Sequence, residues 1–175
     1  ADVTRTFPVN GKFTEVQAKV YNAVLEAADA AFAVAKPGRK FHELHDAAME
    51  VLAHRLEEWG LLPVSAEVSL TIEGGQHRRW MPHGTSHHLG LDVHDCAQAK
   101  AELYMWAELE PGMVFTIEPA LYFKDEDLSV PEEYRGIGIR LEDDVLCTED
   151  GNVNLSAALP RTVEGIEEWM AKLAK

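Results

Sequence analysis

The sequence predicts an α+β protein in which helices cover an antiparallel sheet. Two helical patterns come early in the chain and one comes at its end, and the residues between them read mostly as short strands. The regular alternation of strand and helix that builds a parallel sheet is missing, so an antiparallel sheet is the arrangement we expect. The 175 residues are enough for one domain with a sizeable core.

The helices are predicted from apolar stripes and from their end signals. Thr14 and Gln17 match a capping box, and the small apolar residues that follow predict a helix that ends at Pro37-Gly38. A second apolar stripe predicts a helix from about Phe41 to Trp59. Thr162 is expected to cap a last helix with a packing face made of Ile166, Trp169, Met170 and Leu173.

Short strands are expected between these helices and before the first one. The chain opens as a strand at about Asp2, and strong strand patterns cover Met113–Ile117 and Ala120–Phe123. Apolar alternation over Gly136–Cys147 predicts a strand or a hairpin. A short strand is also expected over Leu89–Val93.

Residues 61–76 give a mixed signal. Val68, Leu70 and Ile72 alternate with polar residues, which favours a strand, whereas Ser65-Ala66-Glu67 would open a short helix. The second helical stretch carries three histidines that show no spacing typical of a shared pocket. We therefore expect His42, His45 and His54 to be exposed.

Composition and charge limit the kinds of molecule that this protein is expected to bind. The formal net charge is −14, and the pair Arg78-Arg79 is too small to make a basic patch, so nucleic acid and anionic membranes are excluded as expected partners. No apolar run reaches the length that a bilayer requires. Cys96 and Cys147 form no CxxC motif and no disulfide framework, so we expect a cytoplasmic protein.

The most informative stretch runs from His83 to Asp95. Four of the eight histidines fall within it, and Gly84 and Gly90 interrupt any regular element. Imidazole is a common metal ligand and the usual proton carrier near neutral pH. A single histidine would read as an incidental surface residue, but four so close together predict a bent backbone that brings imidazoles to one point.

Three acids complete this picture. Glu118 ends a strong strand and Glu142 lies inside an apolar alternation, where a carboxylate is costly unless it is paired or binds a metal. Together with Asp2 and His87 they make a carboxylate-rich set that suits Mn, Co, Zn or Fe. Sites of this kind can hold two ions that share bridging carboxylates. His83 and His94 would then be free to orient substrate or carry protons.

The sequence around these residues resembles the Xaa-Pro aminopeptidase (aminopeptidase P) and prolidase group of metallopeptidases, from residue 1 to the last helix. The motifs that carry the resemblance are His83-Gly-Thr-Ser-His87, Gly90-Leu-Asp-Val-His94-Asp95, Gly112-Met-Val-Phe-Thr-Ile-Glu118-Pro119, Gly136-Ile-Gly-Ile-Arg140-Leu-Glu142-Asp-Asp and Asp2-Val-Thr-Arg-Thr-Phe-Pro-Val-Asn-Gly.

The resemblance implies the pita-bread fold and a site for two divalent ions, most often manganese, with zinc, cobalt or iron as alternatives. It implies release of an N-terminal residue that precedes proline, by attack of a metal-bound hydroxide, and hence peptides with proline at the second position as substrates. Asp2 and Glu142 would bridge the metals, and His87 and Glu118 would complete one of them. Further roles are implied for Glu118 as proton acceptor, for His83 and His94 in substrate contact and proton transfer, and for Arg140 as support of the acids.

The resemblance also implies parts that this sequence does not contain. A further metal-ligand aspartate and the first half of the sheet would lie upstream, so residues 1–175 are expected to be the C-terminal part of a catalytic domain. We expect such a chain to hold at most one metal well, to have impaired activity, and to associate with the remaining portion or with another copy. The alternatives are a dipeptidase for Xaa-Pro dipeptides and a non-catalytic pita-bread binding fragment.

Overall fold

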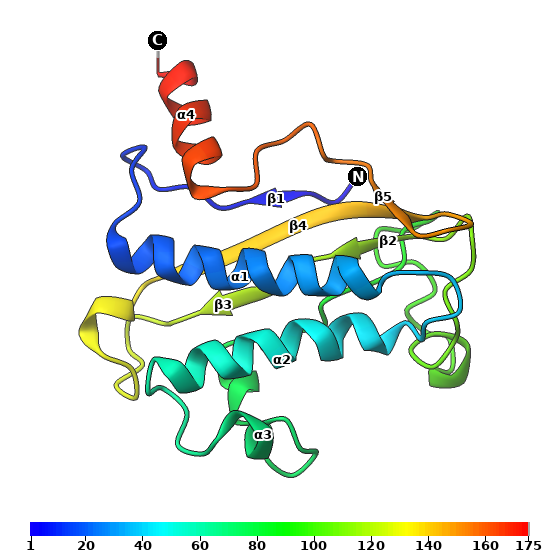
Figure 1. Ribbon diagram of the computed structural model, residues 1–175, viewed down its shortest axis with the longest axis horizontal. Helices are drawn as coiled ribbons and strands as arrows, with labels where there is room; N and C mark the ends of the chain where they lie inside the picture. Colours follow the sequence, from blue (N-terminus) through cyan, green and yellow to red (C-terminus); the bar gives the residue numbers. More distant parts are fainter. Residues whose placement is uncertain (175) are drawn as a thin grey trace.

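The computed structural model describes residues 1–174 and consists of an antiparallel sheet with two long helices on one face (Figure 1). Among these residues, no helix combines the length and the apolar character needed to cross a membrane. The helices and strands are β1 (Thr4–Arg5), α1 (Glu15–Val34), α2 (His42–Glu58), α3 (Ala66–Ser69), β2 (Val114–Ile117), β3 (Ala120–Tyr122), β4 (Gly138–Cys147), β5 (Asn152–Asn154) and α4 (Val163–Leu173), with short 3-10 turns at Gln76–Arg79, Ala101–Leu103 and Glu132–Tyr134.

Strand β4 is the centre of the sheet. It pairs antiparallel with each of the other four strands, and β1 and β2 lie on its two sides. The register places Thr4 opposite Glu142 and Ile117 opposite Asp143, which brings the start of the chain and the end of β2 to the middle of β4. The α+β class is confirmed, and the Gly136–Cys147 pattern forms one long strand rather than a hairpin.

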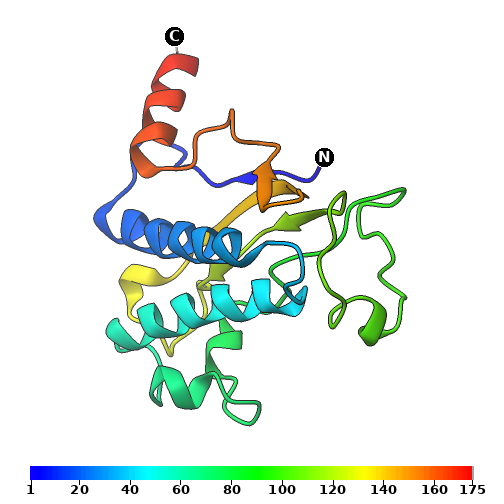
Figure 2. The same cartoon turned by 45° about the vertical axis from the view of Figure 1, so that its right-hand side comes forward.

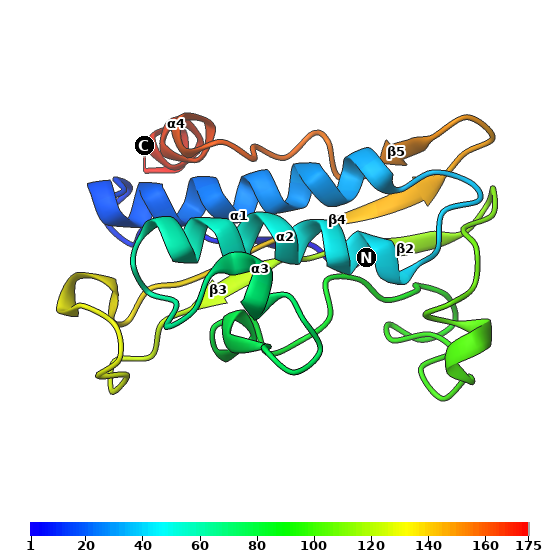
Figure 3. The same cartoon turned by 60° about the horizontal axis from the view of Figure 1, so that its bottom comes forward.

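The hydrophobic core lies between the sheet and the helices α1 and α2. These helices pack side by side over the sheet, as the rotated views show (Figures 2 and 3). Tyr21, Leu44, Phe115 and Leu141 are fully buried there. Since strand side chains alternate between faces, the residues of β4 between its core-facing positions point to the other side of the sheet.

The predicted helix ends agree with the structure at the start of both outer helices. The Thr14 side chain accepts a hydrogen bond from the Gln17 amide, and the reciprocal bond of the capping box is present. Thr162 caps α4 as expected. The predicted packing face of α4 is wrong at Leu173, which is 69% exposed because the last turn of this helix extends away from the sheet (Figure 1).

Two segments with strand-like alternation do not form strands, and the first of them forms the short helix that Ser65-Ala66-Glu67 offered as the alternative. Val68 lies in the short helix α3, where Ser65 caps the first turn, and Ile72 follows in an exposed turn. The Leu89–Val93 stretch is a loop, because Asp95 bonds back to the segment through the His88 carbonyl and the Asp92 amide. In both segments, hydrogen bonds from nearby polar side chains to the backbone determine the conformation and outweigh the apolar alternation.

The three histidines of α2 differ in their surroundings. His54 is exposed as expected. His42 is partly covered, pairs with Asp46 and packs on the Trp106 ring. His45 is also partly buried, and its Nδ1 lies 3.0 Å from the Thr85 hydroxyl, so the prediction that it is exposed is wrong. The loop that carries Thr85 packs against α2 and covers this imidazole.

Candidate active site

His87 lies at the centre of the candidate site, and its ring is oriented by backbone contacts. Its amide donates to the Thr116 hydroxyl on β2, and its carbonyl accepts from the Thr116 amide. The Nδ1 atom lies 3.2 Å from the His88 carbonyl oxygen, an acceptor that requires a proton on Nδ1. In the neutral ring with its proton on Nδ1, Nε2 is the atom that can bind a cation.

Two acidic side chains lie close to Nε2 of His87. Glu118 Oε1 is 3.3 Å away and Asp2 Oδ2 is 3.4 Å away. Among residues 1–174, two sets of ligand atoms lie within 4.8 Å of one another, and both include His87. One set joins it to Glu118 and Glu142, and the other joins it to Asp2 and His94. The structure thus brings together side chains that are far apart in sequence.

The acids of the site are buried and repel one another. Glu142 is 2% exposed. Burial, and then repulsion by Glu142, raise the pKa of the Glu118 carboxyl to about 7. A bound cation would offset this cost, and a neutral imidazole with carboxylate oxygens is a donor set that suits manganese, zinc, cobalt or iron. These residues therefore fit a divalent metal ion.

Glu142 is held in place by β1 and by its own strand. The Thr4 hydroxyl donates to Glu142 Oε2 and accepts from Nη2 of Arg140 at 3.1 Å. The Arg140 Nε atom lies 3.6 Å from Glu142 Oε2, which is expected because residues two apart on a strand share a face. Sequence reasoning missed Thr4, because its partner Glu142 is set by the register of β1 against β4.

His83 lies on the other side of Glu118. Its Nδ1 is 2.8 Å from the Gly84 carbonyl oxygen and 3.9 Å from Glu118 Oε2. Because the carbonyl requires a proton on Nδ1, Nε2 accepts a hydrogen bond from the Tyr122 hydroxyl at 2.9 Å. Tyr122 belongs to β3 and was not predicted as a site residue. Nothing in the sequence around Tyr122 indicated that its hydroxyl would contact a site residue.

The remaining histidines of the stretch take different positions. The ring of His94 is exposed and meets His87 edge-on, with 4.5 Å between ring centroids. His88 points away from the site and stacks on Phe41 in the core. The structure therefore brings together all the residues that the sequence singled out for the site, which are Asp2, His83, His87, His94, Glu118, Arg140 and Glu142.

A cluster of acids around an imidazole, on the open face of an α+β sheet, is typical of a metal-dependent hydrolase. The chain belongs to metallopeptidase family M24, because the model of that family matches residues 1–149. Xaa-Pro aminopeptidase 1 of Streptomyces coelicolor is 57% identical over 173 residues, which are 99% of this chain and 35% of that protein. Xaa-Pro aminopeptidase of Escherichia coli is 43% identical over 177 residues, 99% of this chain and 38% of the relative.

Solved structures give the same result for the fold. Aminopeptidase PepP of Pseudomonas aeruginosa matches with a TM-score of 0.90 and 39% identity, over 97% of this chain and 38% of that chain. Zinc-substituted aminopeptidase P of Escherichia coli in complex with product matches with a TM-score of 0.91 and 42% identity, over 100% of this chain and 39% of that chain. The pita-bread fold is confirmed, and the chain spans less than two fifths of the length of these relatives.

Proposed function

We propose that this chain supplies the metal centre of an aminopeptidase that releases an N-terminal residue preceding proline. The observation that carries the proposal is the position of His87 Nε2, which faces the carboxylates of Glu118 and Asp2. The similarity to Xaa-Pro aminopeptidases over nearly the whole chain supports the reaction and the substrate class. Manganese is the ion we propose first, with zinc, cobalt and iron as alternatives.

A divalent ion bound at such a site acts as a Lewis acid, which polarises the attacked carbonyl and lowers the pKa of water. The other steps fall to side chains of this chain. Glu118 lies between His87 and His83 and accepts the proton of the attacking water. Arg140 and Thr4 hold Glu142 in position.

His83 and His94 serve the peptide rather than the ion in this proposal. His83 is fixed by Gly84 and Tyr122, so it offers a rigid contact beside the scissile bond. His94 is exposed next to His87, where a proton can pass between the site and solvent. Both rings are already placed for these roles, because His83 lies beside Glu118 and His94 lies beside His87.

We further propose that the chain by itself binds one ion tightly. Both ligand sets include His87, and only Nε2 of that ring is free, so the two sets compete for one nitrogen. A centre with two ions would need ligands from a further polypeptide segment or a second copy. Full activity would then depend on that association.

The test begins with metal content and proceeds to peptide cleavage. Plasma mass spectrometry of the purified chain after manganese loading should give close to one ion per chain, and His87→Ala should abolish it. Hydrolysis is then measured with a tripeptide and a dipeptide that both carry proline second. Cleavage of the tripeptide, at the reduced rate expected of the chain by itself, supports the proposal, and cleavage of the dipeptide alone would make the protein a dipeptidase. A chain that binds no metal would contradict the proposal and favour a binding fragment.

A further inference from the structure

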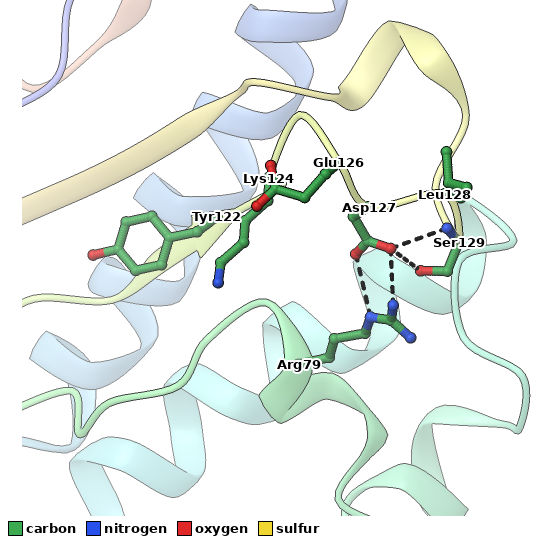
Figure 4. Close-up of a pocket in the computed structure, with 7 residues that line it drawn as sticks. All are labelled: Arg79, Tyr122, Lys124, Glu126, Asp127, Leu128 and Ser129. Atoms are coloured by element: carbon green, nitrogen blue, oxygen red, sulfur yellow. Dashed lines mark hydrogen bonds and ion pairs between the residues drawn. The ribbon is translucent and has the colours of Figure 1, made fainter.

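A cavity of about 540 Å³ lies beside the candidate active site and shares one wall with it. Tyr122 is that wall, because its hydroxyl contacts His83 while its side chain also lines the cavity. Figure 4 shows the cavity with Tyr122 at one end, Asp127 and Ser129 at the other, and Arg79 across from them. Through Tyr122, the cavity adjoins the His83 side of the candidate site.

One pair of charges in the cavity is already satisfied. Both oxygens of Asp127 accept hydrogen bonds from the Arg79 guanidinium, and Asp127 also accepts from the Trp80 indole and from Ser129. This arrangement neutralises Arg79 and fixes the far wall of the cavity (Figure 4). The pair therefore contributes little net charge to the cavity.

Lys124 differs from this pair. Within residues 1–174 no carboxylate lies within ion-pair distance of its ammonium group, the neighbouring Glu126 included. Its side chain extends from the end of β3 into the space between Tyr122 and Arg79 (Figure 4). The cavity therefore presents an unpaired cation close to the side of the site where Tyr122 and His83 meet.

The cavity differs in charge from the cluster of acids beside His87. Glu118, Glu142 and Asp2 gather around that imidazole, where they attract the ammonium of a peptide N-terminus. The cavity carries one unpaired cation, Lys124, together with Glu126 and the paired Asp127. Lys124 is therefore the group in the cavity that can attract a carboxylate on the later residues of a peptide whose N-terminus lies at the acids.

We propose that Lys124 binds a carboxylate on the part of the peptide that follows proline, an inference that rests on the proposed function. The carboxylate comes from the C-terminus of a short peptide or from an acidic side chain next to the proline. Because Lys124 is exposed, the attraction is moderate and weakens as salt is added. Lys124 is then a specificity residue that favours short or acidic peptides.

The experiment measures binding rather than turnover. The manganese-loaded full chain is titrated by calorimetry with the dipeptide Pro-Leu and with its C-terminal amide, which lacks the carboxylate. We expect the free acid to bind up to about fivefold tighter than the amide, as for an ion pair at an exposed site. This ratio should fall towards one in Lys124→Gln and at high salt, and Lys124→Arg should restore part of it.

Lys36→Gln is the matched control, because it removes the same charge from an exposed position outside the cavity and should keep the ratio. Titration with Pro-Glu amide separates the two sources, since only a side-chain carboxylate remains in that peptide. Equal affinities for acid and amide, or an unchanged ratio in Lys124→Gln, would overturn the role of Lys124 alone. If neither Pro-Leu nor its amide bound, the proposed function of the site would itself be contradicted.

Discussion

The guanidinium of Arg5 forms an ion pair with the carboxylate of Asp143 inside the protein, with only 4% and 1% of the two side chains exposed. The pair joins β1 to β4. Asp143 also accepts a hydrogen bond from Ser156 and faces Arg161, which lies 3.0 Å away in the segment before α4. One buried carboxylate therefore ties three separate segments together, and β1 is the segment that carries Asp2 to the candidate metal site.

Replacing Asp143 by Asn should destabilise the protein strongly. It would leave the guanidiniums of Arg5 and Arg161 without their buried partner, and breaking such a pair costs about 3 kcal/mol. Urea denaturation monitored by circular dichroism measures the change in unfolding free energy. Arg55→Met, which breaks an exposed pair with Glu26, is the control and should change stability by less than about 1 kcal/mol. Equal effects of the two substitutions would contradict the prediction.

Substitution His87→Ala should remove most of the metal affinity. His87 belongs to both ligand sets, and its loss leaves only carboxylates and the exposed His94. We expect manganese and zinc to bind at least about 100-fold more weakly, which is beyond the usual effect of losing an outer hydrogen-bond partner. Calorimetric titration measures the affinity. His54→Ala, on the exposed side of α2, should bind metal as the unmodified chain does.

Thr4→Val should weaken metal binding without removing a ligand. The Thr4 hydroxyl connects Glu142 to Arg140, and valine has nearly the same shape but cannot donate or accept. Loss of such a second partner lowers metal affinity by roughly tenfold. Thr4→Ser keeps the hydroxyl and should bind metal normally in the same titration. A valine variant with unchanged affinity would show that Glu142 needs no help from β1.

The contribution of His77 to stability should be lost as the pH falls below about 6.5, the ordinary pKa of histidine, while Glu118, whose pKa is raised, acts in the opposite direction. His77 is buried and bonded to Ser69, and burial lowers the pKa of its imidazole below that value. The unfolded chain therefore binds a proton more readily than the folded chain, so stability present above this pH is lost on acidification. Urea denaturation between pH 7.5 and 5.5 measures the slope.

A histidine substitution identifies the source of that slope. His77→Gln should remove the loss of stability on acidification that His77 causes, because glutamine does not titrate, so this variant should keep more of its stability at pH 5.5 than the unmodified chain does. His54→Gln should leave the slope unchanged, since His54 is exposed on α2. An equal slope in the His77 variant and the unmodified chain would place the effect elsewhere, for instance at His45, whose pKa burial also lowers.

Most of the fold could be predicted because long helices and buried strands leave strong periodic patterns. The capping box at Thr14 and the alternation along β4 both appear in the structure. The segment around Leu91 was misread as a strand and the segment around Val68 gave a mixed signal, because bonds from Asp95 and Ser65 to nearby backbone decide their shape. Short polar contacts of this kind outweigh an alternation of only a few residues.

A residue of the candidate site could be predicted only where its side chain was unusual for the sequence pattern around it. Glu142 was noticeable because a carboxylate in an apolar strand is costly. Thr4 and Tyr122 were missed, since a hydroxyl on a strand is ordinary and its partner is known only from the register. His45 was misjudged because the loop that covers it comes forty positions later.

Strand β4 carries three acids in succession, and each contacts a different part of the protein. Glu142 faces the imidazole of His87, Asp143 faces the two guanidiniums, and Asp144 accepts the Asp2 amide. Side chains on a strand alternate between faces, so deleting a single residue before this triplet would send each carboxylate to its neighbour's surroundings. A point substitution here disturbs one of these surroundings, whereas loss of one codon disturbs all three, so a variant with one codon lost here should fail to fold.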